Sequence, residues 1–109
     1  EISQVEICGP AVVVIKFHDE DEAVAIANNS EYGLAAYIQS NDLQRVHRLS
    51  ERLNAGGVYN NGGFQINPHT PFGGVGISGF GKEGGKAGID EFLHYKTVTI
   101  GVGAPIFPK

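Results

Sequence analysis

The fold class is decided by Ala11-Val12-Val13-Val14-Ile15-Lys16-Phe17 and by the acidic stretch that follows it, Asp19-Glu20-Asp21-Glu22. A continuous apolar, β-branched run is typical of a strand that is buried on both faces, as parallel strands beneath helices are. The acidic stretch fits the start of a helix, where negative charge is favourable and where Asp19 or Asp21 can cap the first turn. Asn28-Asn29-Ser30 ends this helix, so the sequence predicts a strand followed by a helix.

The next sixty residues repeat this alternation. We expect a second short strand at about residues 34–39 and a third at 58–60. Between them, Ser40 or Asn41 caps a longer helix, and Gly56-Gly57 ends it in the left-handed conformation. This helix carries an apolar stripe with helical spacing, formed by Leu43, Val46, Leu49 and Leu53. The order strand, helix, strand, helix, strand predicts an α/β architecture with parallel pairing.

Residues 61–81 break the pattern, because this glycine-rich stretch follows neither the period of a strand nor that of a helix. A loop of this length inside a compact domain is uncommon unless it is functional. Residues 82–94 are expected to be helical again, although each glycine there weakens the helix by about 1 kcal/mol. Residues 97–100 are expected to form a final strand, and residues 101–109 a tail.

The composition excludes several classes of protein. The chain has 109 residues, which is one small domain or a piece of a larger one. Eight Lys and Arg against 12 Asp and Glu give a net charge of -4, which disfavours nucleic acid as a partner. No apolar run approaches the roughly 20 residues that a membrane helix needs. A single Cys suits a reducing, cytoplasmic compartment, and the absence of Met suggests a fragment or a processed product.

Within the loop the pattern G-x-G-x-x-G occurs twice, at Gly74-Gly76-Gly79 and at Gly79-Gly81-Gly84. A dinucleotide fingerprint requires a strand directly before it, a βαβ unit and an acidic residue about 20 positions later. Pro71-Phe72-Gly73-Gly74 does not have the pattern of a strand, and half of residues 73–88 are glycine, so chance matches are expected. We interpret the stretch as a loop whose backbone packs closely against another part of the protein.

The remaining chemistry-bearing residues give weaker signals. Cys8 stands beside Glu6 and Ile7, which do not favour a reactive thiolate, and we interpret it as a small, partly buried residue. The four histidines lie apart without the spacing of a metal site, so we expect no bound metal. Glu6 lies in a tight turn, where a carboxylate could accept a pair of hydroxyl hydrogen bonds from a ribose diol. Glu83 follows the glycine loop at a helix start; both residues could equally be ordinary solvated carboxylates.

Taken together, these segments resemble the C-terminal part of the aldehyde dehydrogenase superfamily. The resemblance covers nearly the whole chain in seven ordered matches: Glu6-Ile7-Cys8-Gly9-Pro10, residues 22–28, residues 31–36, residues 54–61, Pro71-Phe72-Gly73-Gly74, residues 78–85 and Tyr95-Lys96-Thr97-Val98. The family's chains are several times longer, which agrees with the absence of Met.

The resemblance implies an enzyme that oxidises an aldehyde to a carboxylic acid with NAD or NADP through a covalent cysteine intermediate. It implies that Glu6 binds the hydroxyls of the nicotinamide ribose, and that Cys8 takes the place of a Phe that contacts the nicotinamide. Asn61 and Phe72 would border the substrate tunnel, and Glu83 would take part in proton movement. Gly76 is a second departure, since the family usually has Lys there. The family's nucleophilic Cys, general-base Glu and dinucleotide-binding fold would lie upstream.

By the same resemblance, residues 1–94 would be the C-terminal part of the catalytic domain, and residues 95–109 an oligomerisation strand and tail. The parent would then be a homodimer or homotetramer acting on an aldehyde, with no nucleic-acid or membrane partner, and this chain alone would be inactive. The alternative is a noncatalytic structural or interaction module derived from the family.

Overall fold

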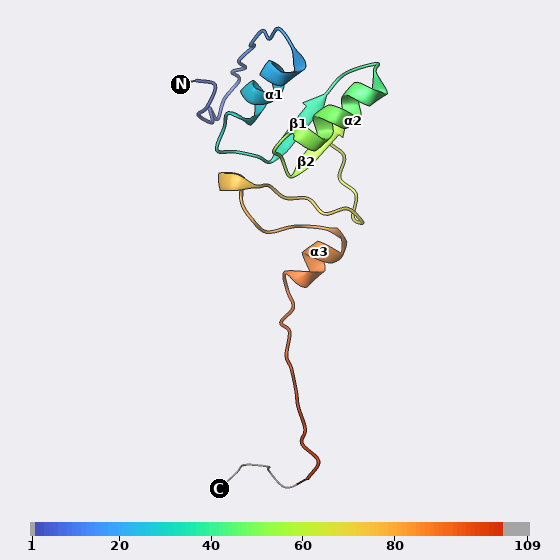
Figure 1. Cartoon of the computed structure of the whole chain (residues 1–109). Coiled ribbons are helices and arrows are strands. Elements are labelled where there is room, and N and C mark those ends of the chain that lie inside the picture. The colour runs from blue at the N-terminus through green and yellow to red at the C-terminus, as the bar shows by residue number, and fades with distance from the viewer. Residues whose placement is uncertain (1, 104–109) are drawn as a thin grey trace, which may run out of the picture.

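The computed structural model describes residues 2–103 (Figure 1). The elements follow the order α1 (Glu20–Asn28), β1 (Ala35–Ile38), α2 (Leu43–Arg52), β2 (Gly57–Asn60), the 3₁₀ turn η1 (Gly76–Ser78) and α3 (Gly85–Asp90). β1 and β2 pair in parallel, in a register that places Ala35 opposite Gly57 and Ile38 opposite Asn60. The predicted α/β alternation and parallel pairing are therefore confirmed for residues 20–60.

The core of this unit is small and lies where the two helices meet the sheet. One valine from each helix, Val24 of α1 and Val46 of α2, is buried together with Ile38 of β1. Helix α2 provides the crossover between the two parallel strands and contacts both α1 and β1. Of the predicted apolar stripe, Val46 is buried whereas Leu43, the first residue of the helix, is 66% exposed.

The start of α1 agrees with the sequence prediction. Asp19 has extended backbone, and its carboxylate accepts a hydrogen bond from the backbone N–H of Glu22 at 2.9 Å. This geometry satisfies one of the free N–H groups at the helix start, as an N-cap does. Helix α1 ends at Asn28, also as predicted.

The ends of α2 differ from the prediction. Asp42, and neither Ser40 nor Asn41, caps the helix, with its carboxylate accepting from the backbone N–H of Arg45 at 3.1 Å. This hydrogen bond also lowers the pKa of Asp42. At the other end the helix ends at Leu53, whose backbone is extended. The prediction that Gly56-Gly57 ends the helix in the left-handed conformation is therefore wrong. Gly57 instead opens β2.

Three other predicted elements are absent or shorter within the described chain. Residues 11–17 and 97–100 form no strand, because a strand needs a neighbour for its backbone N–H and C=O groups and no other described segment pairs with them. Val12 is 88% exposed, so residues 11–17 are not buried as predicted. The helix expected over 82–94 is confined to α3, because the backbone N–H and C=O of Glu83 both bond to Phe72.

The chain as a whole is elongated. Its radius of gyration is 21.7 Å, whereas a compact chain of this length has a value of about 13 Å. Figure 1 shows the reason: the α1–β1–α2–β2 unit stands at one end, and the segment after α3 runs away from it as an extended arm. None of the helices in the part of the chain described here is long and apolar enough to cross a membrane.

Ion pairs join the outer faces of α1 and α2. The carboxylate of Glu20 accepts from Arg45 at 2.7 Å and from Arg48 at 3.0 Å, and Asp21 pairs with Arg52 at 2.6 Å. The hydrogen bond from Arg45, followed by that from Arg48, holds the pKa of Glu20 below its ordinary value of 4.5. The pairs are exposed to solvent, so each is screened by salt.

The lowered pKa of Glu20 predicts a pH-dependent stability. Because the folded pKa is depressed, the contribution of Glu20 is fully present above pH 4.5 and is lost as the pH falls through the folded value. We expect the melting temperature of the protein to fall over this acid range, and to fall less in Glu20→Gln. Glu51→Gln is the matched control, since Glu51 lies on α2 outside these ion pairs. Equal acid sensitivity of Glu20→Gln and the wild type would contradict the assignment.

Candidate functional site

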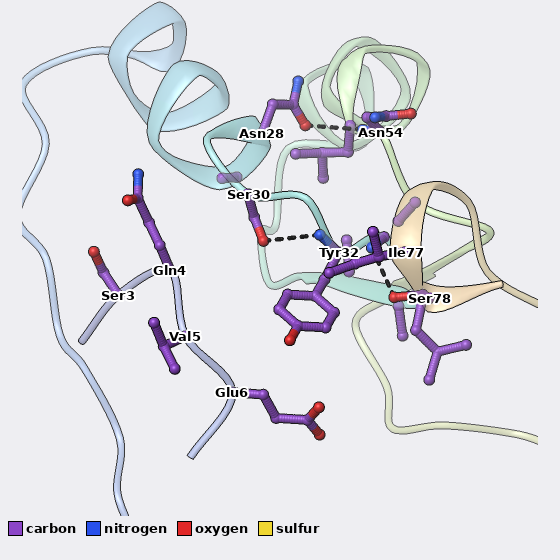
Figure 2. Close-up of a pocket in the computed structure, with 17 residues that line it drawn as sticks. Ser3, Gln4, Val5, Glu6, Asn28, Ser30, Tyr32, Asn54, Ile77 and Ser78 are labelled. Atoms are coloured by element: carbon purple, nitrogen blue, oxygen red, sulfur yellow. Dashed lines mark hydrogen bonds between the residues drawn. The ribbon is translucent and has the colours of Figure 1, made fainter. Parts of the chain in front are cut away.

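Glu6 lies in an open cavity of about 610 Å³ (Figure 2). One wall is the N-terminal segment Ser3–Glu6, and the opposite wall consists of residues 30–36 together with the η1 turn. Figure 2 shows the Glu6 side chain reaching out from the N-terminal segment on the side where the ring of Tyr32 lies. The Glu6 carboxylate makes no hydrogen bond or ion pair to the described residues, so both of its oxygens remain free to accept.

The Glu6 carboxylate supplies this cavity with hydrogen-bond acceptors. A carboxylate with two free oxygens can accept from two adjacent hydroxyls. Two of the other polar side chains that line the cavity are used within the protein: Ser30 accepts from the backbone N–H of Tyr32 at 3.1 Å, and Asn28 bonds to Arg52 and Asn54 at 2.8 Å each. Glu6 is the one carboxylate among the residues that line this cavity, so it is the strongest hydroxyl acceptor among them.

Cys8 differs from the sequence prediction. Its side chain is exposed rather than partly buried. Cys8 also lies outside the residues that line the Glu6 cavity. Cys8 is therefore close to Glu6 in the sequence but does not line the same cavity.

Asn61 has a structural position at the end of the sheet. Its backbone is left-handed, with φ of 52°, a conformation that Asn tolerates better than most residues. Its side-chain oxygen accepts from the backbone N–H of Ser40 at 2.8 Å, and its side-chain nitrogen donates to the Ser40 carbonyl at 2.9 Å. The Asn61 amide thus clasps the segment that leaves β1, and none of the cavities discussed here includes it.

Phe72 and Glu83 are brought together by the backbone. They form an isolated antiparallel bridge in which each backbone N–H donates to the carbonyl of the other at 2.7 Å. Both residues line two neighbouring cavities, of about 580 Å³ and about 550 Å³. The aromatic ring expected at a substrate tunnel and the carboxylate expected in proton movement therefore flank the same two openings.

A series of aromatic contacts leads from the sheet to this pair, and the sequence analysis missed it. Tyr37 stacks on Tyr59 at 5.4 Å between ring centroids, Tyr59 meets the edge of Phe64 at 5.5 Å, and Phe64 meets Phe72 at 5.2 Å. Tyr37 and Tyr59 are direct partners in the parallel register. The occurrence of Tyr at the third position of both short strands was the signal that could have revealed the first contact.

The predicted residues thus occupy two separate places. Glu6 lies in the first cavity, whereas Phe72 and Glu83 line the other two. Leu34 and Ser78 line both the Glu6 cavity and the 580 Å³ cavity, so they form the wall between them. Within residues 2–103, no group of His, Cys, Asp and Glu side chains is arranged to hold a metal ion, and the prediction of no bound metal stays a prediction for the whole protein.

Residues 1–98 match the model of the Aldehyde dehydrogenase family. Over 99 residues the chain is 50% identical to succinate-semialdehyde dehydrogenase (NADP+) 1 of Schizosaccharomyces pombe. The matched region covers 91% of this chain and 20% of that protein. It is 43% identical to glutarate-semialdehyde dehydrogenase of Pseudomonas aeruginosa, over 92% of this chain and 21% of the relative.

Solved structures agree with these matches. HpcC from Thermus thermophilus superposes with a TM-score of 0.87 at 46% identity, covering 99% of this chain and 21% of that one. A Mycobacterium tuberculosis aldehyde dehydrogenase complexed with NAD+ gives a TM-score of 0.84 at 35% identity, over 96% and 22% of the two chains. The chain spans about a fifth of the length of the relatives that it matches.

The clasp formed by Asn61 predicts a loss of stability when its amide is removed. Asn61→Ala deletes both hydrogen bonds to Ser40 and places Ala, which tolerates positive φ less well than Asn, in the left-handed conformation. We expect the free energy of unfolding to fall by about 1–3 kcal/mol in urea denaturation. Asn41→Ala is the control, because the exposed Asn41 side chain forms no hydrogen bond to the described residues. Equal stability of the two variants would show that the clasp contributes nothing.

Proposed function

Because the chain belongs to the aldehyde dehydrogenase family, we propose that it is a C-terminal part of the catalytic domain of an NAD- or NADP-dependent enzyme that oxidises an aldehyde to a carboxylic acid. The observation that carries this proposal is the continuous family match over residues 1–98. The names of the relatives support both cofactors, since one is specified with NADP+ and a solved structure contains NAD+.

We also propose a class of substrate. Three relatives that this chain matches act, by name, on succinate semialdehyde or glutarate semialdehyde, which carry a carboxylate at the end opposite the aldehyde. A semialdehyde is therefore the substrate class that the similarity supports for the whole protein.

In this proposal each site residue has a distinct role. Glu6 accepts the hydroxyls of the nicotinamide ribose, because its carboxylate is free in its cavity. Cys8 follows two residues later and is exposed, which is compatible with contact to the nicotinamide. Phe72 borders the substrate path and Glu83 holds or transfers a proton beside it, whereas Asn61 lies outside the cavities that Phe72 lines.

The bound cofactor would supply the hydride acceptor, and the nucleophile would come from another part of the protein. Cys8 is the only thiol in this chain, and no acceptor of its proton lies within hydrogen-bond distance among the described residues. A thiol needs a base or an electropositive pocket to act as a nucleophile. We therefore expect this chain to be inactive when produced alone.

A noncatalytic interaction module is the second candidate. It is favoured by the exposed apolar side chains of the two extended segments, Val12 and Val14 in one and Val98 and Ile100 in the other. Such surfaces are commonly covered by another chain or by the rest of the same protein. Activity measurements separate the two candidates.

The first test compares the full-length protein that contains this chain with the chain alone. We expect the full-length protein to reduce NAD+ or NADP+, followed by absorbance, and to use succinate semialdehyde at least about ten-fold more efficiently than the uncharged aldehyde butanal, the difference that one charged contact provides. The chain alone should give no signal. No turnover of any aldehyde by the full-length protein would favour the interaction module, and turnover by the purified chain would return Cys8 to consideration as the nucleophile.

The second test concerns Glu6. Replacing its carboxylate by an amide keeps the size of the side chain and removes the charge that strengthens hydroxyl hydrogen bonds. Glu6→Gln in the full-length protein is expected to raise the KM for the cofactor, or to slow hydride transfer, by roughly 10- to 100-fold. Thiol acylation by an activated ester should remain nearly unchanged.

A melting curve provides the control for the Glu6 test. If Glu6 merely braces the turn before residue 11, Glu6→Gln lowers the melting temperature and leaves stopped-flow hydride transfer as in the wild type. That combination of results would remove Glu6 from the cofactor site.

We further propose that the parent is a dimer or tetramer to which residues 97–100 contribute a strand. In the described part of the chain this segment has no partner, and Val98 is 70% exposed. An unpaired, β-branched segment readily pairs with another chain. Truncation after Tyr95 is expected to shift the protein toward monomer or aggregate in light scattering, and an unchanged oligomer would exclude this role.

A further inference from the structure

The loop between Phe72 and Glu83 contains five glycines. Its two largest apolar side chains point outward, with Ile77 59% exposed and Phe80 96% exposed. Glycine has more backbone freedom than any other residue, so a loop of this composition needs specific ties to adopt one conformation. The backbone bridge between Phe72 and Glu83 closes the loop only at its base.

Lys82 forms a hydrogen bond across the loop, the Lys82 tie. Its ammonium group donates to the carbonyl of Gly74 at 2.7 Å, and among the described residues this is the side-chain hydrogen bond that joins the two arms of the loop. The acceptor belongs to a buried residue, and Lys82 itself is partly buried. A charge-assisted hydrogen bond in such a place is stronger than one between neutral groups.

The stem of Lys82 also packs across the first arm. A Cβ added to Gly73 would lie 2.8 Å from Cδ of Lys82. On the other side, the backbone N–H of Lys82 donates to the carboxylate of Glu91 at 3.2 Å, just beyond α3. The backbone of Lys82 is therefore bonded to the carboxylate of Glu91, while its side chain is bonded to the carbonyl of Gly74.

The far part of the loop is tied to a different element. Ser78 accepts a hydrogen bond from the backbone N–H of Gly33 at 3.0 Å, and the backbone N–H of Val75 donates to the carbonyl of Gly33 at 3.0 Å. These bonds fix the η1 turn against the segment before β1. The arm that carries Gly74 then connects this fixed turn to Phe72.

We propose that Lys82 is a positioning residue that holds the glycine loop closed and thereby sets the placement of Phe72 and Glu83. The two residues adjoin the tied arms directly, Phe72 before Gly73 and Glu83 after Lys82. This role rests on the proposed function only in so far as Phe72 and Glu83 serve aldehyde oxidation. The tie itself is independent of any activity.

The test replaces Lys82 in the full-length protein. Lys82→Met keeps an apolar stem and removes the ammonium group, whereas Lys82→Arg keeps a charged donor. Lys86→Met is the matched control, because Lys86 lies four residues later in an exposed pair with Asp90. Amide hydrogen exchange of residues 74–81 and steady-state kinetics are measured for all of them.

We expect Lys82→Met to speed exchange in residues 74–81 by about ten-fold or more, corresponding to the loss of one charge-assisted hydrogen bond. Exchange in α1 and α2 should remain as in the wild type. The kcat should fall by about ten-fold while the KM for the cofactor changes less than about two-fold, since Glu6 lies in another cavity. Lys82→Arg should restore most of both effects, and Lys86→Met should show neither.

Unchanged amide hydrogen exchange of residues 74–81 in Lys82→Met would show that Lys82 does not hold the loop. Faster exchange with an unchanged kcat would show that Lys82 does not position Phe72 and Glu83 for the reaction. If the wild-type protein oxidises no aldehyde, the proposed function fails, but the exchange measurement still decides on the tie. Should Lys82→Met not fold, Lys82→Gln is measured instead, for which a smaller acceleration in the same residues is expected and an unchanged rate again overturns the tie.

Discussion

The arrangement depends on a close approach of three backbone segments around Gly33. The carbonyl of Gly33 accepts from the backbone N–H of both Gly56 and Val75, each at 3.0 Å. A Cβ on Gly33 would lie 2.8 Å from the carbonyl oxygen of Asn54, and a Cβ on Gly56 would collide with the carbonyl of Gly73. The segments before β1, before β2 and within the glycine loop can therefore meet only because side chains are missing at these positions.

This contact explains why the cavities lie where they do. With Gly33 and Gly56 in contact with the loop, the η1 turn stands between the Glu6 cavity and the opening beside Phe72 and Glu83, with Ser78 in both walls. A residue with a side chain at either glycine would push the loop outward and merge or distort the two spaces. The spatial separation of the Glu6 and Glu83 carboxylates thus follows from backbone packing.

The sequence predicted well those features that depend on neighbours along the chain. The cap at Asp19, the end of α1 and the strand-helix-strand order over residues 34–60 arise from local hydrogen bonds and apolar spacing, which are visible in one segment at a time. The close backbone packing expected of the glycine loop is also present. Its partners, however, lie about 40 and 20 residues upstream, and no local pattern identifies them.

Other predictions were wrong or missing because they concern features that depend on a distant partner segment. Residues 11–17 have the composition of a buried strand, yet Val12 and Val14 are almost fully exposed. The composition of a segment indicates whether its side chains would pack well in a sheet. A strand forms only when another segment supplies the backbone hydrogen bonds. The Asn61 clasp escaped prediction because its partner is the backbone of Ser40, which has no signature in the side-chain sequence.

The contrast between the compact unit and the exposed apolar segments also bears on the site. Val24, Ile38 and Val46 form a core large enough to orient two helices on two strands, but it does not reach residues 2–17 or 91–103. Glu6 therefore faces its cavity from a segment that the described core does not hold. Hydrogen bonds to a ribose would have to order this segment as well as bind the cofactor, unless further contacts of residues 11–17 fix it first. Since strands buried on both faces are fixed by neighbouring strands and helices, the placement of Glu6 depends on whatever covers residues 11–17, whereas Phe72 and Glu83 are already placed by the backbone pair and the Lys82 tie.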